Sequence, residues 1–182
     1  LVEMGPNEEK LLQSSIISDP TLVMDPTGQT LPERLDAAHW GQLSEAMEAR
    51  GIPAVMASRM RPWYVATMLA FSPCDMEQMM AKGGATNGLD ERLIDTAEAA
   101  SVEIEALEPW DTVFRIFDNL SPQDEIDMIV YSLPMAKYAD DYNTTMEDAY
   151  RAGDIWQIWE FGRLDAYKNS GMPKAEVDRM LA

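Results

Sequence analysis

The chain has 182 residues, 46% of them hydrophobic, which is long and apolar enough to bury the core of one domain. Its 14 basic and 32 acidic residues give a formal net charge of −18, which would repel phosphate backbones and anionic lipid surfaces and so argues against nucleic-acid binding. No apolar run approaches the roughly 20 residues that a membrane-spanning helix needs, so no membrane insertion is expected, and the single cysteine, Cys74, excludes an internal disulfide.

The first thirty residues have the most strand-like pattern of the chain. Short apolar segments at 1–4, 15–18 and 22–24 are separated by the turn signals Asp19-Pro20 and Asp25-Pro26. The sequence therefore predicts a short hairpin or sheet edge here.

The next part of the chain changes to a helical pattern. Apolar residues between Leu31 and Gly51 share one helical face, and the glycine supplies a C-terminal stop. Pro62 can occupy the first turn of a following helix that extends to Ala70. Ser72-Pro73 then resembles an N-cap followed by a first-turn proline. Three successive helices are expected in this part.

The segment from Asn87 to Glu108 predicts a turn, a helix and a strand. Asn87-Gly88 is a turn signal, and apolar residues from Leu89 to Ala100 repeat at helical spacing. Val102, Ile104 and Ala106 then alternate with acidic residues, as in a half-buried strand that ends at Leu107. Glu108 follows this strand, where α/β folds usually carry functional groups.

Helical patterns fill the rest of the chain. Pro109 starts one helix, and Ser121-Pro122-Gln123-Asp124 resembles a capping box that begins the next. A long helix should end near Gly153, an aromatic-rich helix follows over residues 154–168, and a last helix begins after Pro173.

Three segments carry a family resemblance. They are the Gly88-Leu89-Asp90 turn with the helix and the Leu107-Glu108 strand end that follow it, the opening Leu1-Val2-Glu3, and the polar turn and amphipathic helix from Thr30 to Gly51. In this order and spacing they resemble the TraB/GumN family, which includes the Tiki proteins and is related in fold to the erythromycin esterase and ChaN-like proteins. With the helical hairpins after Glu108, the resemblance covers most of the chain.

The resemblance implies an α/β fold, rich in helices, with a small sheet formed by the N-terminal residues and the Val102–Leu107 strand. Family members carry a Gly-x-x-His motif near each end of the domain, proposed to form a metal site. This sequence has one histidine, His39, and its surroundings do not fit the motif. We therefore expect a single domain over residues 1–182 that is truncated at both ends. The resemblance alone favours the cell envelope or periplasm.

The function implied by the resemblance is that of a metal-dependent hydrolase, and of a protease as proposed for Tiki proteins. Glu3 and Glu108 both end predicted strands, and adjacent parallel strands would bring their carboxylates to one sheet edge. There they could bind a divalent metal such as Mn, Co or Zn, or act as a general base. Arg61 would position a carboxylate or carbonyl of a peptide or small-molecule substrate.

In this hypothesis, histidines outside the chain complete the metal centre. The chain alone should then be inactive and hold no tightly bound metal.

Each candidate also has a structural explanation. In a chain with 32 acids, an acid at the end of a strand is commonplace. Arg59 and Arg61 can form ion pairs with nearby acids. The 14 methionines fit adaptable core packing better than a Cu(I) site.

A non-enzymatic alternative is an acidic helical interaction module. Its aromatic C-terminal helices, with Tyr142, Trp156 and Trp159, would bind a partner protein or a second copy of the chain. The two hypotheses make different predictions. Glu3 and Glu108 in one pocket favour the hydrolase, whereas an exposed apolar patch of the three aromatic residues favours the interaction module.

Overall fold

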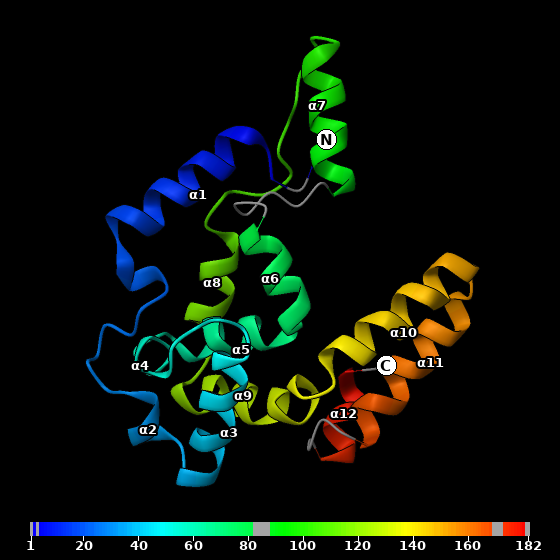
Figure 1. Ribbon diagram of the computed structural model, residues 1–182. Coiled ribbons are helices and arrows are strands. Elements are labelled where there is room, and N and C mark those ends of the chain that lie inside the picture. Colours follow the sequence, from blue (N-terminus) through cyan, green and yellow to red (C-terminus); the bar gives the residue numbers. More distant parts are fainter. Residues whose placement is uncertain (1, 3, 82–87, 169–172, 181–182) are drawn as a thin grey trace.

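The computed structural model of the protein describes residues 2, 4–81, 88–168 and 173–180. Within these residues the chain forms α-helices joined by short connections, with one 3-10 helix near the start (Figure 1). In chain order the elements are α1 (Pro6–Ser18), η1 (Pro20–Leu22), α2 (Leu31–Arg34), α3 (Ala37–Glu48), α4 (Ala54–Ala57), α5 (Pro62–Ala70), α6 (Pro73–Ala81), α7 (Leu89–Ala99), α8 (Thr112–Asp118), α9 (Pro122–Ala136), α10 (Ala139–Ala152), α11 (Ile155–Lys168) and α12 (Lys174–Met180).

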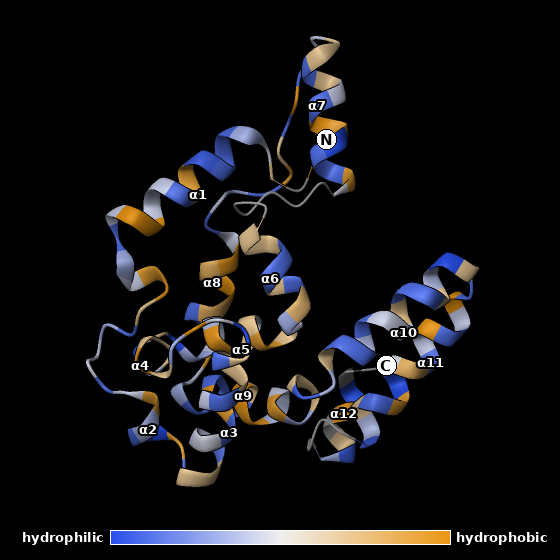
Figure 2. Ribbon diagram, in the orientation of Figure 1, coloured by the Kyte–Doolittle hydropathy of each residue, from blue (hydrophilic) through white to orange (hydrophobic). Residues whose placement is uncertain are grey.

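The core lies where α5 and α9 pack against each other, with α3 in contact with both. Helical spacing explains which side chains face inward, because residues three or four apart share a face. Figure 2 shows hydrophobic segments on α5, α8 and α9, around the place where these helices meet. The most deeply buried apolar side chains of the three core helices are Leu43, Met47, Val65, Leu69 and Ile129.

An aromatic cluster attaches α8 to this core. The ring of Trp63 on α5 stacks on Phe117 with centroids 4.5 Å apart, and it meets Phe114 edge-on at 5.8 Å. Such pairs add to the stabilisation that burial of the rings already provides.

Several local signals in the sequence form as predicted. Ser121 and Asp124 make the capping box at the start of α9: the Ser121 hydroxyl accepts from the Asp124 N–H, and the Asp124 carboxylate accepts from the Ser121 N–H. Gly153 ends α10 in a left-handed conformation with φ 72°. Helices α5 and α6 begin at Pro62 and Pro73, the first-turn prolines of the sequence pattern.

The predicted small sheet, and with it the predicted α/β fold class, is wrong. No β-strand forms in the described ranges, where helices dominate. Val2 and Ala106 instead form an isolated parallel bridge. Its bonds run from the Val2 N–H to the Glu105 carbonyl (3.1 Å) and from the Leu107 N–H to the Val2 carbonyl (2.9 Å). Val102 and Leu107 are exposed, so this segment lacks the buried face that stabilises a sheet.

The strand predicted at 15–18 is also wrong, because these residues form the last turn of α1. Pro6 at the first helical position, with Glu8 and Glu9 in the first turn, provides a strong helix start. These signals outweigh the strand preference of the two isoleucines near its end. In the 22–24 segment, Leu22 belongs to η1, and Met24 forms an isolated antiparallel bridge with Met60.

The helix predicted from Leu31 to Gly51 is divided into α2 and α3. Leu35 is extended, with φ −103° and ψ 152°, and ends α2. The Asp36 carboxylate then accepts from the N–H groups of Ala38 and His39, which caps α3. The N-cap preference of aspartate explains the division.

Helices α10 and α11 run side by side and project from the core helices, with α12 against α11 (Figure 1). A polar contact connects them to α6: the Asn143 amide donates to Asp75 at 2.6 Å. Among the described residues, no helix combines the length and apolarity required to cross a membrane.

Candidate functional site

Glu108 is exposed and lies in the connection between α7 and α8, two residues after the Val2–Ala106 bridge. This connection is held in place by the two backbone hydrogen bonds of that bridge. Glu3, its predicted partner, lies outside the described residues. The predicted meeting of the two carboxylates therefore stays a prediction.

Arg61 precedes α5 and forms an ion pair with the last residue of α8. Its Nη1 donates to Asp118 Oδ1 at 2.8 Å, and its backbone N–H donates to the Val23 carbonyl. Helix α8 has seven residues, a length of about 10 Å. Glu108 precedes the start of α8, whereas Arg61 binds its end. The structure thus places these two predicted site residues at opposite ends of one helix.

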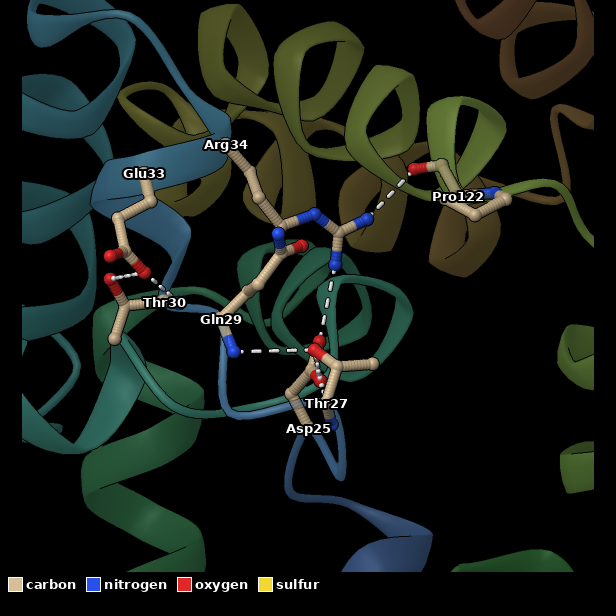
Figure 3. Close-up of polar contacts among 7 residues, drawn as sticks. All are labelled: Asp25, Thr27, Gln29, Thr30, Glu33, Arg34 and Pro122. Carbon is tan, nitrogen blue, oxygen red and sulfur yellow. Dashed lines mark hydrogen bonds and ion pairs between the residues drawn. The ribbon is translucent and has the colours of Figure 1, made fainter.

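Arg34 is the centre of a polar network beside Arg61. Its guanidinium donates to the Asp25 carboxylate at 3.2 Å and to the Pro122 carbonyl at 2.8 Å, so it connects the loop before α2 with the start of α9 (Figure 3). Both side chains of the ion pair are largely buried. In the same view, Glu33 accepts from the Thr30 N–H and hydroxyl and so completes the capping box of α2.

Glu125, in the first turn of α9, completes this charged cluster. Partial burial raises the pKa of its carboxyl group, and the positive charges of Arg34 and Arg61 oppose that shift. Asp25 and Asp118 reinforce it. The two arginines are therefore already matched by acids of the chain. Of the two ion pairs, Arg61–Asp118 is the more exposed, and so it is the one more easily exchanged for a substrate carboxylate.

The donor groups in the described part of the chain do not make a metal centre by themselves. No three His, Cys, Asp or Glu side chains within it gather closely enough to hold an ion. The ring Nδ1 of His39 lies 2.6 Å from Asp36 Oδ2. The hydrogen bonds from His39, first its backbone N–H and then its ring, lower the pKa of Asp36. Glu108 could thus supply one carboxylate to a metal, but not a complete set of ligands.

Arg50 is a buried arginine with a structural role, which the sequence did not reveal. It is 2% exposed and donates to carbonyl oxygens at the C-terminal ends of three helices: Ala46 on α3, Leu69 and Phe71 at the end of α5, and Ala136 on α9. Burial lowers the pKa of the Arg50 guanidinium, and the charge of Asp140 opposes that shift. A cation at helix C-termini also complements their partial negative charge.

The aromatic residues of the C-terminal helices are divided between packing and exposure. Tyr142 on α10 is half-buried and packs against Phe161 of α11, with ring centroids 5.3 Å apart. Trp156 and Trp159 are exposed on α11. The predicted patch of three aromatic residues is therefore formed by the two tryptophans without Tyr142.

Comparison with known proteins decides the family. The sequence model of the TraB/PrgY/gumN family matches residues 1–181. This chain belongs to that family. The resemblance inferred from the Gly88-Leu89-Asp90 turn and its neighbouring segments is thereby confirmed.

Beyond this family match, no curated protein and no solved structure matches the chain. The family match therefore gives the protein family of the chain, but assigns no activity or metal to it. Of the predicted site residues, the structure describes Glu108, which is exposed, and Arg61, which belongs to a charged cluster with Arg34 and Glu125.

Three functional or structural residues were missed from the sequence: Arg34, Arg50 and Glu125. A signal existed for two of them. Arg50 directly precedes the glycine that ends a predicted helix, where basic residues stabilise helix C-termini. Arg34 follows the capping-box spacing of Thr30 and Glu33. No local signal marks Glu125, because its charged neighbours come from other segments of the chain.

Proposed function

We propose that this TraB/PrgY/gumN-family chain is part of a metal-dependent hydrolase that acts on peptides. Glu108 is its contribution to the catalytic centre, either as a metal ligand or as a general base. The position of Glu108, exposed and directly after the bonded Val2–Ala106 bridge, is the observation that supports this role. The family match supports the choice of protein class.

The other ligands of this centre must come from outside the described residues, because none of those residues forms a metal-holding group with Glu108. Arg61 would bind a substrate carboxylate by exchanging its partner Asp118, whose side chain is exposed. When bound, the metal would polarise the scissile carbonyl or activate water.

Metal titration tests this proposal. Mn²⁺, Co²⁺ and Zn²⁺ are titrated calorimetrically into the complete gene product that contains residues 1–182, and into its Glu108→Gln variant. We expect one of the metals to bind, and the variant to lose about tenfold or more in affinity. Glu103→Gln, an exposed acid of the same segment, is the matched control. No binding, or equal binding by wild type and Glu108→Gln, would contradict a metal-ligand role.

A second function, the binding of a partner protein, is favoured by a separate observation. Trp156 and Trp159 are both exposed on α11, although tryptophan is usually buried for most of its surface. Exposed tryptophans that lie together are typical of protein interfaces. This function is compatible with the first, because α11 is a different element from the one that carries Glu108.

A further inference from the structure

Helix α11 carries an exposed apolar surface at its N-terminal half. We call it the α11 aromatic face and define it by Ile155, Trp156 and Trp159. Trp156 is 71% exposed and Trp159 is 50% exposed. Trp156 is three residues and Ile155 four residues before Trp159, so each of the two lies next to Trp159 on the helix surface. They form a continuous surface rather than scattered apolar residues.

The same side of α11 is already a helix-binding surface at its other end. Trp156 and Tyr167 are eleven residues apart, three helical turns on one row of the helix. Helix α12 covers the Tyr167 end: the Tyr167 hydroxyl donates to Asp178 at 2.6 Å, and the Lys174 ammonium lies 5.2 Å from the ring centroid. Val177 of α12 is fully buried. Helix α12 thus packs on this row of α11 with a lysine over an aromatic ring. It does not cover the α11 aromatic face.

The charge around this face selects its partner. Residues 139–168 of α10 and α11 contain seven acidic and three basic side chains. Two of the bases are engaged within the pair of helices, Arg151 with Glu147 and Arg163 with Glu160. The pair of helices that carries the face therefore has a net charge of 3 − 7 = −4. A second copy of a chain with net charge −18 would be repelled from it, whereas a cationic segment would be attracted.

We propose that the α11 aromatic face binds a basic amphipathic helix of a partner protein. The apolar side of that helix packs on Trp156 and Trp159, and its lysines or arginines lie over the acidic side chains of α10 and α11. This inference rests on the proposed protein-binding function and names the class of partner. It is independent of the role of Glu108.

Two designed peptides test the proposal with the 182-residue chain. Each has about 18 residues and an amphipathic helical pattern of leucine with one charged residue type, lysine in the first and glutamate in the second. Binding is measured by calorimetry at low and high salt. We expect the lysine peptide to bind, with an affinity that falls as salt rises, and the glutamate peptide not to bind.

Variants locate the binding surface. Trp156→Ala combined with Trp159→Ala should weaken binding of the lysine peptide about tenfold or more. Val55→Ala is the matched control, because Val55 on α4 is 73% exposed and lies on another helix. Circular dichroism checks that each variant keeps its helices.

Other outcomes would overturn the inference in distinguishable ways. Equal binding of both peptides, lost in the tryptophan variant, would retain a docking surface but exclude a basic partner class. Binding that is unchanged in the tryptophan variant would place the site elsewhere. No binding by a monomeric chain would overturn the protein-binding function as well. Self-association that the tryptophan variant abolishes would assign the face to a second copy.

Discussion

At the scale of single residues, Arg50 has the largest structural role of the charged side chains described. Its guanidinium satisfies four carbonyl oxygens that the ends of α3, α5 and α9 leave without helical partners. Planar geometry with several fixed donors suits arginine to this position, and lysine would not replace it. The residue thus fixes how three core helices meet.

Replacement of Arg50 by methionine should therefore be strongly destabilising. The variant leaves buried carbonyl oxygens unsatisfied, and we expect a loss of about 3 kcal/mol in the free energy of unfolding measured with urea. Arg50→Lys should recover only part of this loss. The control is Arg151→Met, which removes an exposed ion pair with Glu147 and should cost less than about 0.5 kcal/mol. Similar losses for both methionine variants would contradict the role of Arg50.

Glu125 should make stability depend on pH. Because burial raises its pKa in the folded state, the folded protein binds this proton more tightly than the unfolded chain does. The resulting stabilisation is present below the unfolded pKa and is lost as pH rises through the folded pKa. The Glu125→Gln variant has no titrating group at this position, so it does not lose this stability as pH rises. The difference in unfolding free energy, variant minus wild type, should therefore increase as pH rises from about 4 towards neutrality.

Urea unfolding of wild type and Glu125→Gln across that pH range measures this difference. Asp127→Asn, which removes another carboxylate from α9, serves as the control. A difference that stays constant or decreases with rising pH would show that the raised pKa does not contribute to stability.

At the scale of elements, the end of α7 carries strain that can be relieved. Ser101 has a positive φ of 54°, in the left-handed region that favours glycine. The hydrogen bonds around it, from the Ser101 N–H to the Glu98 carbonyl and from the Val102 N–H to the Ala97 carbonyl, form a Schellman motif. The geometry is that of a glycine cap occupied by serine.

Ser101→Gly should stabilise α7. Glycine relieves the left-handed strain of the folded state, but its greater freedom in the unfolded chain offsets part of this stabilisation. The net stabilisation should slow hydrogen exchange of the last α7 amides about two- to fivefold. Ser101→Ala keeps a Cβ atom and should give no slowing. Equal exchange in Ser101→Gly and wild type would mean that the strain at this position is negligible.

Elements with local signals were predictable from the sequence, whereas elements that depend on distant contacts were not. The Ser121–Asp124 capping box and the Gly153 stop act over a few residues, and both formed as predicted. The segment at 102–107 has a correct strand alternation, but a sheet also requires a buried face and further strands. For the candidate site, Arg50 illustrates the limit: one of its acceptors, Ala136, is 86 residues away in sequence.

At the scale of the whole molecule, the described residues separate three regions. The main cluster of buried apolar side chains is centred on α3, α5 and α9, which Arg50 joins at their C-terminal ends. The connection with Glu108 lies beyond α7, and the exposed tryptophans lie on α11, which projects with α10 from the core (Figure 1). The proposed catalytic contribution and the proposed docking surface can therefore be altered independently.

Peptide hydrolysis by the complete gene product tests the proposed function most directly. The assay compares wild type, Glu108→Gln and the control Glu103→Gln, each with and without Mn²⁺, Co²⁺ or Zn²⁺. We predict hydrolysis that requires one of these metals and that falls about a hundredfold or more in Glu108→Gln only. Hydrolysis that is metal-independent, or equal in wild type and Glu108→Gln, would contradict the account, as would its absence under all conditions.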